Sequence, residues 1–177
     1  SPSRGLGDVY KRQPYILGGK VLKRSVLKFG GSSVADFIKI KNIAEMLKNR
    51  VDDGEQLIVV VSAMGKTTDQ LMDNVSNLTA TPKDEELALL LTTGEQQTVS
   101  YLSMVLNDIG VNARAMTGYQ AGIKTIGHHL KSRIAEINPE TFDKAFTDKD
   151  VLVVAGFQGI NDAFEPVSYT HLRAHET

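Results

Sequence analysis

Cysteine is absent from the 177 residues of this sequence. Its absence excludes disulfides, a thiolate nucleophile and any cysteine-ligated metal site. Long hydrophobic runs are also missing, because the longest, residues 57–61, is far shorter than the ~20 residues that a membrane-spanning helix requires. The first residues contain no apolar segment of the signal-peptide type. These absences favour a protein of the reducing cytoplasm that works without a membrane.

The sequence also lacks an excess of charge of either sign. Lysine and arginine together number 20, aspartate and glutamate together number 21, and the formal net charge is -1. This balance offers no positive field to nucleic acid or anionic lipid, so we expect neither partner, and any anionic ligand must be held by local groups. With 41% hydrophobic and 23% charged residues, the composition is that of one globular domain with a sizeable core.

Aliphatic runs alternate with helical patterns through the middle of the chain. Strands are predicted at 25–29, 57–61, 111–116, 134–137 and 151–155. Helices are predicted at 34–50, after the loop 62–69, at 84–91, after Gly94 and at 139–146. Ser32 and Ser33 offer hydroxyls to cap the first of these helices. The order predicts an α/β fold, a mostly parallel sheet sandwiched between helices, with ligands bound beyond the carboxyl ends of the strands.

The two ends of the chain carry neither strand alternation nor a helical stripe. Both resemble sequencing-adapter stretches that have been translated in frame. We therefore expect a non-native or disordered end at residues 1–18, a folded domain at 19–166, and a non-native tail at 167–177.

The first candidate site follows the first predicted strand, in the segment Lys28-Phe29-Gly30-Gly31-Ser32-Ser33. Glycine lets backbone amides approach an anion closely, and the N-terminus of the next helix adds a favourable dipole. Lys28 would supply a positive charge for the oxygens of a transferred phosphoryl group. The same spacing fits an ordinary tight turn with a solvated lysine, so both interpretations are open on spacing alone.

The second candidate site is the loop that follows residues 57–61. Its Gly65-Lys66-Thr67 looks like the end of a P-loop, but the glycine that this motif needs at position 60 is Val60. The loop is therefore not a P-loop. The hydroxyls of Ser62, Thr67 and Thr68 fit either a carboxylate or phosphate site or a cap for the next helix, and without further context capping is favoured.

The third candidate is Glu95, in the segment Thr93-Gly94-Glu95, which we place at a helix start. A carboxylate there is favourable with the helix dipole and needs no function, although it would also suit a substrate ammonium group. The adjacent His128 and His129 match no metal-binding pattern and are predicted to lie on the surface. No metal site made of protein side chains is predicted.

Five segments, taken together and in this order, resemble the aspartate kinases of the amino acid kinase family. They are Lys28 to Val34, Val60 to Asp69, Thr93 to Glu95, Gln120 to Ile123, and Val154 to Gly159. The loop 62–69 and the Ala-Gly-Phe-Gln-Gly segment separate aspartate kinases from their sister kinases. The resemblance implies that residues 19–166 are the N-terminal part of an amino acid kinase domain.

The resemblance also implies a reaction, in which the γ-phosphate of ATP is transferred to the β-carboxylate of L-aspartate with Mg²⁺. This step leads to lysine, threonine and methionine. The intact enzyme is expected to be a homo-oligomer. The implied catalytic residue is Lys28, which would neutralise charge on the γ-phosphoryl group. The other implied contacts are Phe29, Gly30, Gly31 and Ser62 with the phosphates of ATP, and Ser32, Thr68 and Glu95 with the substrate, Glu95 through its α-ammonium group.

Two other functions fit the sequence. Another amino acid kinase, acting on glutamate or acetylglutamate, would share the Lys-Gly-Gly opening, although Glu95 and the loop 62–69 argue against it. A non-catalytic ligand-binding module of the same fold is the second. The family continues into a Gly-Arg-Gly-Gly-Ser-Asp-Thr-Thr segment, which does not follow Glu165 here, so we expect the 177-residue chain to be inactive by itself.

Overall fold

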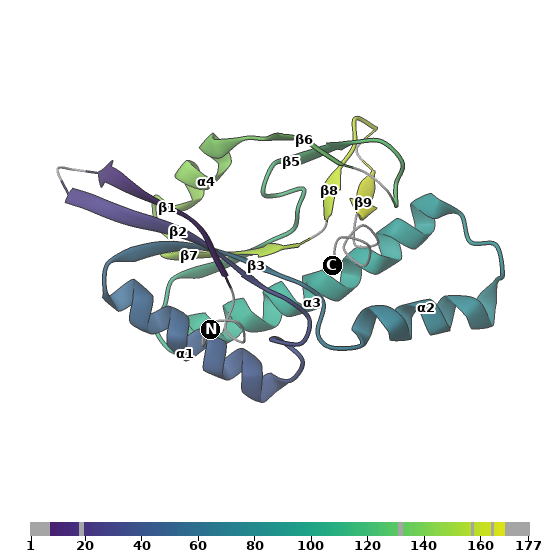
Figure 1. The fold of residues 1–177 in the computed structure, drawn as a ribbon, viewed down its shortest axis with the longest axis horizontal. Coiled ribbons are helices and arrows are strands. Elements are labelled where there is room, and N and C mark those ends of the chain that lie inside the picture. Colours follow the sequence, from purple (N-terminus) through teal and green to yellow (C-terminus); the bar gives the residue numbers. More distant parts are fainter. Residues whose placement is uncertain (1–7, 18–19, 131–132, 157, 164, 169–177) are drawn as a thin grey trace.

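A five-stranded sheet is the centre of the molecule (Figure 1). The computed structural model describes residues 8–17, 20–130, 133–156, 158–163 and 165–168. In spatial order the strands are β1 (Asp8–Leu17), β2 (Lys20–Phe29), β3 (Glu55–Val61), β7 (Val151–Ala155) and β4 (Ala113–Met116). β1 runs antiparallel to β2, and the other four strands are mutually parallel. The predicted, mostly parallel sheet is therefore confirmed, with β3 as its central strand.

Two helices, α1 (Phe37–Asp52) and α3 (Asp84–Asp108), cover one face of this sheet (Figure 1). Side chains of successive strand residues point to opposite faces, so Leu57, Val59 and Val61 of β3 all enter the core beneath these helices. Each of the three is fully buried. Helix α2 (Thr67–Leu78) has no buried residue and lies beside the first half of α3.

The opposite face is covered by α4 (Pro139–Ala145) and by a second, smaller sheet. The strands of this sheet, in spatial order, are β6 (Arg133–Ile137), β5 (Ile123–Ile126), β8 (Gln158–Ile160) and β9 (Pro166–Ser168). All five residues of β7 are buried, because Val151, Val153 and Ala155 face the α1–α3 core while Leu152 and Val154 face a second core beneath α4. Burial on both faces explains why this strand is a continuous aliphatic run.

Two predicted helix boundaries are wrong. Helix α1 begins at Phe37, and its cap is the Asp36 carboxylate, which accepts from the Lys39 amide at 2.8 Å; Ser32 and Ser33 do not cap it. The helix starts late because residues 31–36 form turns. The break expected at Gly94 is absent, since α3 is one helix of 25 residues.

The structure describes part of each of the two predicted end segments. Residues 8–17 form β1 against β2, although the sequence there shows no strand alternation. At the other end, 166–168 form β9, and 169–177 lie outside the described residues. That both ends are additions to the domain stays a prediction. Within the described ranges, no helix is long and apolar enough to cross a membrane.

Arg24 links three elements at the amino end of the main sheet, which leads to a test of α4 docking. Its guanidinium donates to Asp143 at 2.8 Å and to Gln56 at 3.1 and 3.3 Å, and lies 4.4 Å from the centre of the Phe146 ring. We expect Arg24→Leu to lower the free energy of unfolding by about 2 kcal/mol, measured by urea denaturation.

The matched control is Lys124→Leu. Lys124 pairs with Glu136 at 3.8 Å, and both side chains are more than 60% exposed, so its loss should have little effect. Equal destabilisation by the two changes would contradict a docking role for Arg24.

Candidate active site at the carboxyl edge of the sheet

Three loops leave the main sheet at the same level. The register pairs Phe29 with Val61 and Val61 with Ala155, so β2, β3 and β7 end side by side. Two further backbone hydrogen bonds extend the ladder past these ends, from the Ser62 amide to the Phe29 carbonyl at 3.2 Å and from the Gly156 amide to the Val61 carbonyl at 2.8 Å. The parallel pairing thus gathers the segments that follow all three strands at one edge.

The first two of these loops are fastened together. The Gly65 amide donates to the Gly31 carbonyl at 3.0 Å, and the Ser33 amide donates to the Gly30 carbonyl at 3.0 Å. A Cβ on Gly31 would lie 3.1 Å from the Ala63 carbonyl oxygen, which is closer than most side chains tolerate. The absence of a side chain at position 31 therefore permits the close approach of the second loop.

Lys28 and Phe29, at the end of β2, point to opposite faces of the sheet. Phe29 is fully buried in the α1–α3 core, so only its backbone is available to a ligand at the edge. Lys28 is half-buried and lies on the other face, with Arg24 and Val26, because strand side chains alternate. Its register partner is Val60 on β3. The lysine of the first candidate site is thus held by the sheet, not by a surface turn.

The expected hydroxyls lie in the fastened loops or at the helix that follows. Ser62 is buried directly after β3, and Thr68 is half-buried in the first turn of α2. Ser32 is exposed, and its carbonyl accepts from the Lys39 ammonium at 3.0 Å. The N-cap residue of α2 is Lys66, which makes no side-chain capping hydrogen bond, so neither Thr67 nor Thr68 is the cap residue.

Glu95 lies in the middle of α3, so its prediction at a helix start is wrong. It is 2% exposed, and its Oε2 lies 3.4 Å from the amide nitrogen of Gln158. Burial raises the pKa of Glu95 from 4.5 to about 7, although hydrogen bonds from its backbone and from Gln158 oppose this shift. A carboxyl group with this pKa is partly protonated at neutral pH. A positive charge placed beside it would favour the ionised form.

The residue before Glu95 joins α3 to the second loop. A Cβ on Gly94 would lie 3.0 Å from the Ala63 Cβ and 3.6 Å from the Thr67 Cγ2. The helix continues through this glycine, and the hydroxyls of Thr92 and Thr93 just before it donate to carbonyls within α3, at Leu89 and Leu90. The close contact brings the turn that carries Glu95 against the loop that carries Ser62, so the structure gathers both at one edge.

Gln158, the first residue of β8, also belongs to this arrangement, although the sequence predicts no role for it. It is buried and contacts both α3 and the turn after β4. Its only signal in the sequence was its place in the Ala-Gly-Phe-Gln-Gly segment. The described residues contain no group of three or more histidine, aspartate or glutamate side chains that could hold a metal ion.

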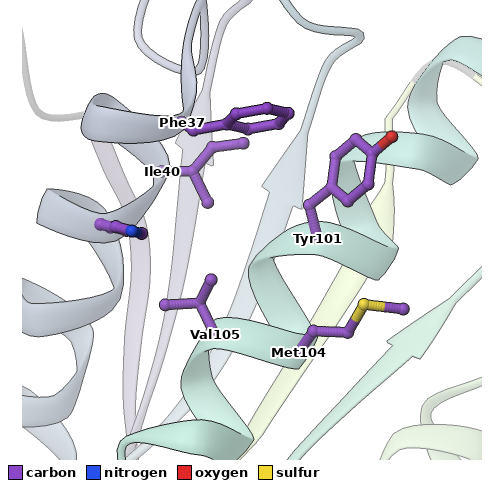
Figure 2. Close-up of a pocket in the computed structure, with 6 residues that line it drawn as sticks. Phe37, Ile40, Tyr101, Met104 and Val105 are labelled. Carbon is purple, nitrogen blue, oxygen red and sulfur yellow. The ribbon is translucent and has the colours of Figure 1, made fainter.

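A groove between α1 and α3 is a separate feature, shown in Figure 2. It encloses about 230 Å³ and is lined almost entirely by apolar atoms, including those of Phe37, Ile40, Tyr101, Met104 and Val105. None of the candidate site residues lines it, and it offers little to a charged nucleotide or amino acid.

A comparison with models of protein families shows to which family this fold belongs. The model of the amino acid kinase family matches residues 23–168, which include every candidate site residue. The chain belongs to the amino acid kinase family.

Similar members of the family are aspartokinases. That of Bacillus sp. (strain MGA3) is 45% identical over 137 residues, which are 77% of this chain and 33% of the relative. That of Mycobacterium tuberculosis (strain ATCC 25618 / H37Rv) is 39% identical over 143 residues, 81% of this chain and 34% of the relative. The chain therefore spans about a third of the length of the curated relatives it matches.

Solved structures agree with this fold. Aspartate kinase from Synechocystis matches with a TM-score of 0.66 and 36% identity, over 82% of this chain and 23% of that one. Aspartokinase III of E. coli, solved in complex with aspartate and ADP, has a TM-score of 0.65 over 80% of this chain and 42% of its own. At 16% identity, the second likeness supports the fold alone.

The contact between Gly94 and Ala63 can be tested by a double-mutant cycle. In an open helix position, glycine to alanine stabilises by about 1 kcal/mol. We expect Gly94→Ala to destabilise by about 1 kcal/mol or more instead, because the new methyl group would press on Ala63. In the Ala63→Gly background this loss should shrink by at least about 0.5 kcal/mol, measured by urea unfolding. Strictly additive effects would show that the two residues do not press on each other.

The raised pKa of Glu95 predicts a pH-dependent stability. The folded state holds this proton more tightly than the unfolded state, so the contribution of Glu95 to stability is fully present below pH 4.5 and is lost as the pH rises to about 7. The shift corresponds to a loss of about 3 kcal/mol, complete above the folded pKa. Glu95→Gln should remove this loss, so the variant's advantage in free energy of unfolding grows across that window.

The control for removal of a carboxyl charge is Glu86→Gln, an exposed change on the same helix. Unfolding by urea is followed at several pH values for all three proteins. A constant difference between Glu95→Gln and the unchanged chain at all these pH values would rule out a buried carboxyl with a raised pKa.

Proposed function

We propose that this chain is the N-terminal part of the catalytic domain of an aspartate kinase, which transfers the γ-phosphate of ATP to the β-carboxylate of L-aspartate. The observation that carries the proposal is the fastening of the loops after β2 and β3 through Gly31 and Gly65, with Glu95 packed behind them through Gly94. The identity with aspartokinases supports it. Aspartokinase III of E. coli, which shares this fold, was solved in complex with aspartate and ADP.

The phosphates of ATP are proposed to lie at the end of β2. The backbone amides of the first loop, which carries the consecutive glycines Gly30 and Gly31, would approach these phosphates closely. Gly30, the Phe29 backbone and buried Ser62 would complete this contact, and Lys28 would neutralise charge on the γ-phosphoryl group. Mg²⁺, when bound with ATP, supplies further charge neutralisation at the phosphates.

The amino acid substrate is proposed to lie between α3 and the loops. Glu95 would accept hydrogen bonds from the α-ammonium group, and Thr68 and Ser32 would contact the rest of the substrate. A positive charge beside Glu95 favours its ionised form, so binding of the ammonium group would release the proton that the buried carboxyl holds near neutral pH.

The chemical step proposed for these residues needs no general base. The β-carboxylate of aspartate is already an anion, so the chain's contribution is to align this carboxylate with the γ-phosphate and to neutralise charge, chiefly through Lys28. The role in lysine and threonine synthesis, the cytoplasmic location and the homo-oligomeric state belong to the same proposal.

A chimera tests this function. Residues 23–168 would replace the matching part of aspartokinase 2 of Bacillus subtilis (strain 168), to which the chain is 41% identical over 140 residues. We expect ADP release that depends on L-aspartate, and we expect Lys28→Ala to lower kcat about 100-fold or more, because a preorganised charge at the phosphoryl group is lost.

The matched control in the chimera is Lys48→Ala, which removes a lysine of α1 that pairs with Asp52 at 3.4 Å. It should leave ADP release unchanged. Glutamate and acetylglutamate are offered as alternative acceptors. Preference for either of them over aspartate, or full activity of Lys28→Ala, would overturn the proposal.

A further inference from the structure

Gln158 connects three segments that are distant in sequence. It is the first residue of β8 and is 3% exposed. Its Nε2 donates to the Thr92 carbonyl of α3 at 3.1 Å and lies 3.4 Å from Oε2 of Glu95. Its Oε1 accepts from the Gly118 amide, in the turn after β4, at 3.5 Å. All the polar atoms of one buried side chain are therefore engaged.

The partners of Gln158 fix the direction of its amide. The Gly118 amide is a donor and requires the oxygen on its side, while the Thr92 carbonyl and the Glu95 carboxylate are acceptors and require the nitrogen on theirs. Turning the amide over would place oxygen against two acceptors and nitrogen against a donor. The side chain therefore presents an N–H group to Glu95 in one orientation.

The backbone of Gln158 is held as firmly as its side chain. A Cβ on Gly118 would lie 2.2 Å from the Gln158 carbonyl oxygen, so the turn at 118 rests directly on the main chain of β8. Because Gly118 both contacts this backbone and donates to the side-chain amide, the amide has little freedom to move away from α3.

We propose that Gln158 is a positioning residue, whose amide holds the Glu95 carboxylate in the orientation that receives the ammonium group of the amino acid substrate. The inference rests on the proposed function, since it assigns Glu95 to that ammonium group. Gln158 itself does not touch the substrate. An N–H donor favours the ionised form of a carboxyl, and only this form attracts an ammonium group. Gln158 thus sets both the direction and the charge of its neighbour.

The test compares two ligands that differ by one group. L-Aspartate and succinate carry the same two carboxylates, and succinate lacks the ammonium group. Binding of each to the 177-residue chain is followed by NMR chemical-shift titration. We expect Gln158→Leu to weaken the binding of aspartate about tenfold, because a hydrogen bond to a charged group is lost, and to leave that of succinate unchanged. In a Glu95→Gln background, the same change should have no further effect on aspartate.

The matched control is Gln56→Leu. Gln56 also makes hydrogen bonds between elements, to Arg24, but lies at the opposite end of the main sheet. It should change neither ligand's affinity. If Gln158→Leu fails to fold, Gln158→Asn replaces it, since its amide is one methylene too short to reach Glu95. An equal loss of aspartate and succinate binding would assign Gln158 a merely structural role and overturn the proposal.

A second readout separates this inference from the proposed function. The carboxyl group of Glu95 is titrated by carbon NMR in the ligand-free chain. We expect Gln158→Leu to raise its pKa and Gln56→Leu to leave it as it is. If the unchanged chain binds aspartate no better than succinate, the proposed role of Glu95 is wrong, and this titration alone decides whether Gln158 positions it. An unaltered Glu95 pKa in both Gln158 variants would refute the inference.

Discussion

The common end of three parallel strands is the constraint on which the site depends. Phe29, Val61 and Ala155 are aligned across β2, β3 and β7, and backbone hydrogen bonds from Ser62 and Gly156 carry the ladder one step further. A shift of one residue in β3 would turn Val59 and Val61 out of the α1–α3 core, so burial holds the register in place. The same burial therefore fixes where the loops with Ser62 and Gly30 begin.

Close contacts at glycines then pack the segments at this edge of the sheet against one another. Gly31 lies against Ala63, Gly94 lies against the same residue from the side of α3, and a Cβ on Gly156 would lie 3.0 Å from the Val61 carbonyl oxygen. None of these glycines needs a positive φ, since the glycines with positive φ in the described residues are at other positions. Their common property is the absence of a side chain where another segment packs closely. At Gly94 this brings helix α3, and with it Glu95, against the second loop.

The sequence was informative where local pattern and tertiary structure agree. Val151–Ala155 and the run ending at Val61 are aliphatic because they are buried in the sheet, so their strands and parallel pairing were predictable, as was the place of Lys28 at a strand end. The helix break predicted at Gly94 is wrong because glycine ends many helices, whereas here a close contact with Ala63, 31 positions earlier, favours a residue without a side chain. The second sheet was missed as a unit because its strands are three to five residues long and pair with distant partners. The contact of Glu95 with Gln158 joins residues 63 positions apart, which no local pattern reveals.

Glu95 is the place where stability and proposed function conflict. A carboxyl group that is 2% exposed destabilises the folded chain when it ionises, and hydrogen bonds from its backbone and from Gln158 offset only part of that cost, since the pKa remains near 7. A glutamine at position 95 would avoid the cost, so fold stability does not explain the glutamate. A bound ammonium group would, because it supplies the positive charge that the buried carboxylate lacks, and it would stabilise the folded chain by the same interaction. In the proposed function, the unfavourable burial of one carboxyl group would thus be the physical basis for selecting a ligand that carries an ammonium group.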